Sequence, residues 1–244
     1  MSAWWHAVVE SRHELQNPTS QEKIRLLGQR LALDRSSHVL DVGSGRGGPA
    51  LLLAHEFGCR ITSVELWPEF AAAARERART AGVAELVEVV ERDAKKFPIE
   101  RSGYDAALCL GASFAFGGLV PTVEALVQAV PRRGLIAVGE PFWRQWPLPD
   151  EFELAAGEDF LSLAETVERF EAAGVEVLSL IASSEDDWDR YESLHWSTLE
   201  EWLAANPDDP QAGEFRSRGR DHRNRYLRWR RALMGWAIFV CRAP

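Results

Sequence analysis

Short runs of apolar and β-branched residues alternate with helical stretches along most of this chain. This alternation strongly constrains the fold, because a strand followed by a crossover helix pairs in parallel with the next strand. The sequence therefore predicts an α/β fold, with a mostly parallel sheet and helices on both faces. The runs that predict strands are 38–43, 59–66, 86–92, 104–110, 135–139, 175–181 and 236–241.

Two segments stand outside this alternation. Residues 1–33 precede the first strand and include a helix that begins near Thr19–Glu22, and residues 183–234 separate the last two strands by far more than a hairpin. Long insertions of this kind usually cover a site or carry function. We expect one domain over 1–244, with a helical lid at 1–33, a core at 34–182 and 235–244, and a helical cap at 183–234.

Composition and charge narrow the function classes. The 244 residues are 46% hydrophobic, enough for the core of one large domain, and the net charge of −9 argues against broad binding to nucleic acid or anionic membrane. The first residues lack the pattern of a signal peptide, and no apolar run reaches the length of a membrane span. The three cysteines lie far apart in the sequence, which predicts buried free thiols. We expect a cytoplasmic protein, monomeric or homodimeric, whose partner is a small molecule rather than nucleic acid or a membrane.

The stretch DVGSGRGG, residues 41–48, joins the first predicted strand to the helix after it. Its glycines at 43, 45 and 48 fit the pattern G-x-G-x-x-G, which allows close approach of a ligand to backbone. A phosphate-binding P-loop is excluded, because Gly-Gly-Pro stands where Gly-Lys-Ser or Gly-Lys-Thr is required. A dinucleotide is disfavoured by Asp41, since a carboxylate at this strand end repels pyrophosphate and attracts a cation.

Two further carboxylates end the next two predicted strands. Glu65 can bind both hydroxyls of a ribose, which fits NAD and S-adenosylmethionine alike. Asp93 can accept a hydrogen bond from an adenine amino group, while the Ala94 N–H can serve a ring nitrogen. S-adenosylmethionine carries an ammonium and a sulfonium group, so strand-end carboxylates without a basic phosphate clamp favour it as the cofactor.

These motifs occur together in one known family. Residues 39–48, Glu65, 92–94, 104–105 and 133–134 match, in order, the motifs of the class I S-adenosylmethionine-dependent methyltransferases, which the chain resembles over roughly 38–182 and the terminal strand. The resemblance implies a Rossmann-like sheet of seven strands, the last of them antiparallel. Short pieces at 17–18, 139–145, 188–192 and 205–209 resemble a bacterial group of largely uncharacterised small-molecule methyltransferases. The cofactor-binding residues implied are Asp41, Gly43, Ser44, Gly45, Glu65, Leu66, Asp93, Ala94 and Gly111.

The acceptor site is less specified. Methyl transfer is an in-line displacement, so positioning and exclusion of water can supply much of the acceleration, and a general base is needed only if the acceptor loses a proton. The loop at 111–118 lacks the Asn/Asp-Pro-Pro-Tyr/Phe motif, which weakens an assignment as a methyltransferase of amino groups on bases or glutamine. The candidate catalytic residues are His13, Glu140, Tyr191 and His195. The candidate substrate-binding residues are Asn17, Ser113, Phe114, Trp143, Arg144 and Trp188.

Residues 214–231 contain eight arginines. Because Tyr226, Trp229, Leu233 and Trp236 are spaced for a buried face, most of these arginines are expected on a solvated one. We expect an S-adenosylmethionine-dependent methyltransferase that acts on a small molecule. Two alternatives stay open: an RNA or protein methyltransferase that uses the arginine-rich segment, and an S-adenosylmethionine-binding protein without catalysis.

Overall fold

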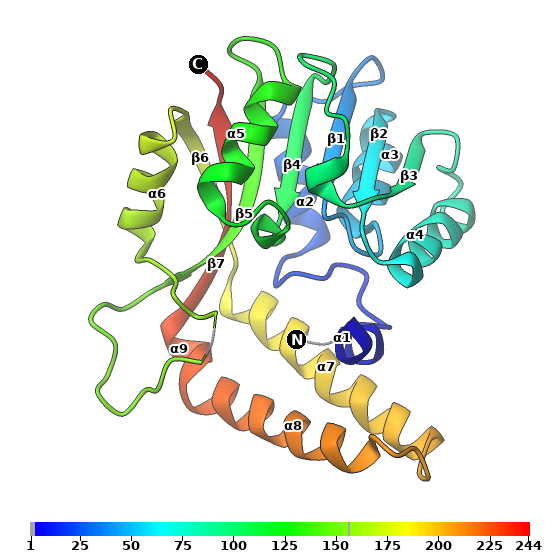
Figure 1. Ribbon diagram of the computed structural model, residues 1–244, viewed down its shortest axis with the longest axis vertical. Coiled ribbons are helices and arrows are strands. Elements are labelled where there is room, and N and C mark those ends of the chain that lie inside the picture. The colour runs from blue at the N-terminus through cyan, green and yellow to red at the C-terminus, as the bar shows by residue number, and fades with distance from the viewer. Residues whose placement is uncertain (1–2, 156) are drawn as a thin grey trace.

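The computed structural model describes residues 3–155 and 157–244, and within them seven strands form one sheet (Figure 1). The order is β3-β2-β1-β4-β5-β7-β6. The first five strands run in parallel, and β7 is antiparallel to both of its neighbours, as the family resemblance implies. The strands are β1 (His38–Val42), β2 (Arg60–Glu65), β3 (Val87–Glu91), β4 (Ala106–Leu110), β5 (Leu135–Trp143), β6 (Glu176–Ala182) and β7 (Met234–Arg242).

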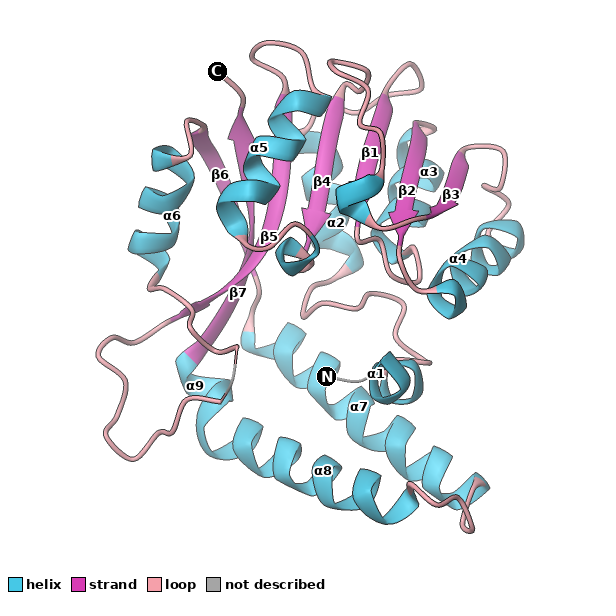
Figure 2. Ribbon diagram, in the orientation of Figure 1, coloured by secondary structure: helices cyan, strands magenta, loops and turns pink. Residues whose placement is uncertain are grey.

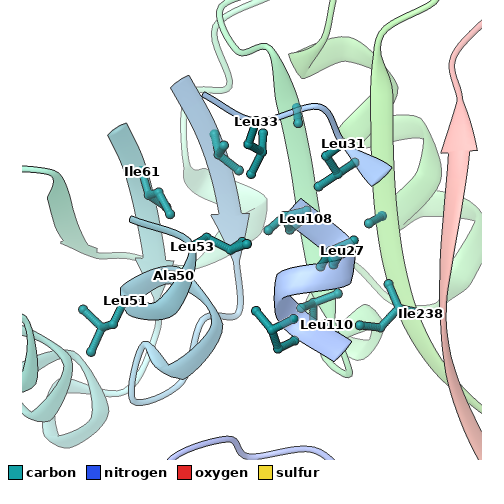
Figure 3. Close-up of a cluster of buried hydrophobic side chains, with 14 of the residues drawn as sticks. Leu27, Leu31, Leu33, Ala50, Leu51, Leu53, Ile61, Leu108, Leu110 and Ile238 are labelled. Atoms are coloured by element: carbon teal, nitrogen blue, oxygen red, sulfur yellow. The ribbon is translucent and has the colours of Figure 1, made fainter. Parts of the chain in front are cut away.

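Helices cover both faces of the sheet and bury its central strands. On one face lie α2 (Gln21–Arg30), α3 (Gly48–Phe57) and α4 (Pro68–Thr80), and on the other α5 (Leu119–Ala129) and α6 (Leu163–Ala172). Figure 3 shows Leu27 of α2 and Leu53 of α3 beside Leu108 of β4, and each of these side chains is 0% exposed. Short 3₁₀ turns, η1 (Ala94–Lys96) and η2 (Ser113–Ala115), follow β3 and β4.

A second group of helices lies at the carboxyl ends of the parallel strands (Figure 2). It consists of α1 (Ala3–Val9), α7 (Glu185–Ala205) and α8 (Ala212–Arg225), and we call it the helical layer. Trp5, Leu199 and Phe215 form part of its own apolar cluster, and a capping box of Ser184 and Asp187 starts α7. A π-helical turn (Tyr226–Arg230) and α9 (Arg231–Leu233) then lead into β7. Among the described residues, no helix is both long enough and apolar enough to cross a bilayer.

Strand β5 differs from the sequence prediction, which ended it at Gly139. It continues to Trp143, because β7 pairs with it over nine residues, from Leu135↔Arg242 to Trp143↔Met234. Its pairing with β4 stops at Gly139, so Pro141 lies where one side of the strand has no neighbour to receive an N–H. Residues 140–143 are therefore strand rather than loop, and β7 is longer than predicted for the same reason.

Candidate functional site

The glycine loop between β1 and α3 turns at Gly43 and Gly45 of the predicted pattern and at Gly47, while Gly48 already begins α3. Gly43, Gly45 and Gly47 have φ values of 68°, 56° and 76°, in the left-handed region that favours glycine. A Cβ on Gly45 would lie 2.3 Å from Oε1 of Gln16, so a side chain at this position would also have to displace the end of the Gln16 side chain. The Arg46 N–H donates to the same oxygen at 2.5 Å. The segment before α2 therefore closes directly onto this loop.

Asp41 at the end of β1 is buried, and one oxygen of its carboxylate lacks a hydrogen-bond partner among the described residues. Its side chain is 2% exposed, and the unpaired oxygen is Oδ2. Burial, together with the negative charge of Glu65, raises the pKa of Asp41 to about 7. A cationic ligand at this carboxylate would supply the missing partner and restore the ionised form.

The carboxylates that end β2 and β3 are oriented by backbone donors. Oε2 of Glu65 accepts from the Gly45 N–H at 2.7 Å and Oε1 from the Trp67 N–H at 2.9 Å, while burial raises the pKa of this group. Oδ1 of Asp93 accepts from the Lys95 N–H at 3.0 Å and caps η1. Each carboxylate keeps lone pairs that can accept hydroxyl or amino hydrogen bonds.

A cavity of about 750 Å³ lies between these strand ends and the helical layer. Predicted residues that line it are Asn17, Asp41, Gly43, Ser44, Gly45, Glu65, Leu66, Asp93, Ala94, Gly111, Phe114 and Tyr191. The structure thus brings all the predicted cofactor residues together, along with three of those predicted for catalysis or acceptor binding. The volume of the cavity lies within the range of small-molecule sites, which is roughly 300–1,000 Å³.

Other predicted acceptor-site residues lie outside the described lining of this cavity. Trp143 is 1% exposed and packs against Phe152 and Phe160, with ring centroids 5.5 Å away in each case. Trp188 belongs to the core on the α2 face of the sheet. The Arg144 guanidinium donates to the carbonyls of Met234 and Ser183, at 3.0 and 3.2 Å. These contacts hold the ends of β6 and β7, because residues 140–143 continue the strand instead of forming a loop over the site.

Glu140 lies on this extension of β5. Burial raises its pKa to about 7, and a side-chain hydrogen bond with Ser113 offsets only part of that effect. Its Oε1 is buried and has no hydrogen-bond partner among the described residues.

The two predicted histidines lie side by side behind the cavity wall. The rings of His13 and His195 are 4.4 Å apart, and Nε2 of His13 is 2.9 Å from the carbonyl oxygen of Tyr191. Burial lowers the pKa of His13 to about 4, with the neighbouring His195 as the next cause, so His13 is neutral at physiological pH. The His13 ring packs edge-on against the ring of Tyr191, and Tyr191 lines the cavity.

The cavity also contains polar residues that the sequence did not single out. Glu10 and Gln16, from the segment after α1, line it together with His6 and Trp67. The Gln16 amide donates to Oε2 of Glu10 at 2.7 Å, and the Tyr191 hydroxyl donates to Oε1 at 3.2 Å. Glu10 and Gln16 stand in a stretch without helical or strand periodicity, so the sequence offered no signal for their orientation.

Comparison with known proteins agrees with this geometry. Residues 39–132 match the family described as a methyltransferase domain. The chain is 35% identical to the uncharacterized protein YjhP of Escherichia coli over 237 residues, 96% of this chain and 95% of YjhP. Crystal structures of S-adenosylmethionine-dependent methyltransferases from Geobacter sulfurreducens and Thiobacillus denitrificans, both in complex with S-adenosylhomocysteine, superpose with TM-scores of 0.92 and 0.91. Each is 34% identical, and each alignment covers 100% of this chain and 99% of the other. The chain belongs to the class I S-adenosylmethionine-dependent methyltransferases.

This methyltransferase therefore uses S-adenosylmethionine, the methyl donor from which S-adenosylhomocysteine is formed. The predicted family, fold, enzyme class and cofactor are confirmed by the domain match and by these structures. The roles of individual residues remain predictions that rest on the geometry described above.

Proposed function

We propose that this methyltransferase transfers the methyl group of S-adenosylmethionine to a small molecule held in the cavity. The observation that carries this proposal is the composition of the cavity wall. The glycine loop and its carboxylates line the cavity together with Glu10, Gln16 and Tyr191, which come from the segment after α1 and from α7. In this proposal, residues 1–33 serve as a lid and residues 183–234 as a cap.

The residues around the glycine loop suit the cofactor. Oδ2 of Asp41 and Oγ of Ser44 are buried without hydrogen-bond partners among the described residues, which is costly unless a ligand supplies them. In this assignment Asp41 faces the cationic part of the cofactor, and Gly43 and Gly45 allow its close approach. Glu65 binds the ribose, Asp93 and Ala94 bind the adenine, and Leu66 covers it.

The acceptor is placed on the remaining side of the cavity. The Asn17 amide donates to the Leu110 carbonyl at 2.9 Å, which fixes Asn17 beside Gly111, and Phe114 and Tyr191 contribute aromatic surface. When bound, S-adenosylmethionine supplies an electrophilic methyl group. The protein's part is to hold the acceptor in line with that group and to exclude water.

The arginine-rich segment weighs against an RNA acceptor. Arg225 and Arg230 both form ion pairs with Glu158, Arg231 pairs with Asp189, and the Arg218 guanidinium lies 4.3 Å from the ring centroid of Trp5. The Arg228 guanidinium likewise lies 5.3 Å from the ring centroid of Trp229. Five of the eight arginines thus have partners within the protein, and a phosphate backbone would have to compete for them. Carboxylates in the cavity would also repel it.

The proposal is tested by measuring S-adenosylhomocysteine formed in the presence of a metabolite panel, total RNA or a protein extract. We expect turnover with a metabolite and none with the macromolecules. Turnover with RNA alone would overturn the small-molecule assignment, and absence of turnover with all three would favour a non-catalytic binding protein. We further propose a cytoplasmic monomer or homodimer, for which light scattering measures the oligomeric state.

A further inference from the structure

A second cavity, of about 500 Å³, lies next to the cavity at the glycine loop, which we call the first cavity. The wall of the second cavity comes from the segment before α2, from the first two turns of α2 and from α7. Asn17 and Tyr191 line both cavities, so the two share a wall. The proposed function gives the second cavity no role.

Two buried polar groups in the wall of the second cavity lack partners. His13 is 3% exposed and Thr19 is 5% exposed, and both line this cavity. Neither Nδ1 of His13 nor Oγ1 of Thr19 has a hydrogen-bond partner among the described residues. Because buried polar groups without partners reduce stability, these two atoms point to a ligand that supplies hydrogen bonds.

The tautomer of His13 shows which hydrogen bond is missing. Nε2 of His13 is 2.9 Å from the carbonyl oxygen of Tyr191, and a carbonyl oxygen only accepts, so Nε2 carries the proton. Since burial keeps the His13 ring neutral at physiological pH, Nδ1 is an acceptor without a donor. A hydroxyl group of a ligand would donate to it, and the Thr19 hydroxyl could donate to or accept from the same ligand.

The N-terminus of α2 forms another part of this wall. Ser20 caps the helix by accepting from the Lys23 N–H at 3.2 Å, while the N–H groups of Gln21 and Glu22 lie in the first turn and have no intrahelical acceptor. The N-terminus of a helix carries a partial positive charge and attracts anions. This end of the cavity therefore suits an anionic group.

Charged side chains around the cavity add donors. Three arginines line it, Arg12, Arg25 and Arg190, against two carboxylates, Glu14 and Glu22. Each of these arginines makes one ion pair within the protein, but a guanidinium has five N–H donors, so donors remain for a ligand. The ion pairs and the two carboxylates offset part of the positive charge, so the cavity suits one anionic group rather than a polyanion.

We propose that the second cavity binds a small molecule that has one anionic group, a carboxylate or a phosphate, and at least one hydroxyl group. The anionic group accepts from the first turn of α2 and from the arginines. The hydroxyl group donates to Nδ1 of His13 and lies near Oγ1 of Thr19. This inference goes beyond the proposed function, because it requires no methyl acceptor in the first cavity.

A ligand in the second cavity also acts on the first, because one segment forms part of both walls. The Glu14 carbonyl accepts from the Arg77 guanidinium at 3.0 Å, and Oε1 of Gln16 accepts from the Arg46 N–H of the glycine loop at 2.5 Å. A ligand that orders residues 13–19 thereby holds the segment that closes on the glycine loop. Binding of the anion and binding of the cofactor therefore strengthen each other by the same factor.

Calorimetry on the full-length protein tests the site. The probes are lactate and glycerol phosphate, which have both groups, and propionate, which lacks the hydroxyl. We expect saturable binding of lactate or glycerol phosphate, and whichever binds more tightly tells a carboxylate ligand from a phosphate ligand. Propionate should bind about 3–10-fold more weakly than lactate, the effect of one lost hydrogen bond. A saturating anion should raise the affinity for S-adenosylhomocysteine about 5-fold or more.

Two variants and a control locate the binding. Thr19→Val keeps the shape of the side chain and removes a hydroxyl that has no partner in the described protein, so it should fold normally and bind the anion about 3–10-fold more weakly. Arg25→Gln should weaken anion binding to a similar extent. Arg30→Gln, at an exposed position on the same helix, is the matched control and should change nothing.

Absence of saturable binding of both lactate and glycerol phosphate would overturn the proposal. Binding that neither Thr19→Val nor Arg25→Gln weakens would also overturn it, because the anion would then lie elsewhere. An affinity for S-adenosylhomocysteine that does not respond to the anion would refute the coupling between the cavities. None of these measurements uses a methyl acceptor, so they are independent of the turnover screen that tests the proposed function.

Discussion

Replacing Asp41 by asparagine should stabilise the ligand-free protein at alkaline pH while weakening its binding of S-adenosylmethionine. Burial and the charge of Glu65 raise the pKa of Asp41 from 3.8 to about 7. The folded protein thus holds this proton more tightly than the unfolded chain does. Asp41 therefore costs no stability at pH values below 3.8; the cost grows as the pH rises from 3.8 to about 7 and is constant above that. Asparagine keeps the shape and removes the charge.

The size of the effect follows from the shift in pKa. A rise from 3.8 to about 7 corresponds to about 4 kcal/mol as an upper limit, at 1.36 kcal/mol per unit. Water in the cavity and relaxation around the carboxylate reduce this figure. We expect a gain of about 1–3 kcal/mol at pH 8, which raises Tm by about 2–12 °C in a protein of this size.

Thermal unfolding of both proteins at pH 5 and pH 8 measures this gain, which should be smaller at pH 5. Calorimetry should show weaker binding of S-adenosylmethionine by the Asp41→Asn variant, more so at low salt because the lost interaction is electrostatic. The affinity for 5′-methylthioadenosine should change little, because that ligand lacks the ammonium and the sulfonium. Equal stability of the two proteins at pH 8 would refute the assigned burial of charge. Parallel losses for both ligands would show that Asp41 braces the loop instead.

Three further outcomes are expected. Glu65→Ala should weaken S-adenosylmethionine binding by about 1.5–3 kcal/mol in calorimetry, and an unaffected variant would contradict the ribose assignment. The wild type should show no saturable binding of NAD. Gly45→Ala should destabilise the protein by about 1–3 kcal/mol in urea unfolding, because alanine is strained at a φ of 56° and its Cβ meets Gln16; unchanged stability would count against this contact. Arg216, Arg220 and Arg223 are all exposed. Reversing their charges together should leave turnover of the small-molecule acceptor nearly unchanged. If the wild type instead binds RNA in a salt-sensitive way and this variant does not, the result would support the RNA alternative.

The core of the fold was predictable because its pattern is local. Each predicted strand from β1 to β4 agrees with the structure to within about two residues, since glycine, proline and charged residues mark the ends of each apolar run. The extension of β5 was not predictable in this way. A proline such as Pro141 normally ends a strand, and pairing with β7, almost a hundred residues later, keeps residues 140–143 extended.

The candidate site divides along the same line. Asp41, Glu65 and Asp93 were found from sequence because each lies at the carboxyl end of a strand or just after it, and parallel strands bring these ends together. Glu10 was missed because its contacts come from α7, about 180 positions away, and no periodicity in its own segment indicates which side chains face inward. Trp143 and Arg144 were assigned to the acceptor site because the sequence predicted a loop after Gly139. In the structure the strand continues to Trp143, and both side chains lie away from the cavity.

The position of β7 has a consequence for how the protein is made. Residues 234–242 form an inner strand of the sheet, between β5 and β6, although they are the last of its seven strands in chain order. A nascent chain that ends before residue 234 leaves β5 without its partner along nine residues and β6 without a neighbour in the sheet. Unpaired strand edges readily associate with other chains, so the growing polypeptide is exposed to aggregation until β7 has been synthesised. Codon usage and chaperone access during translation of residues 183–242 should therefore influence the yield of this enzyme more than events during synthesis of its cofactor-binding half.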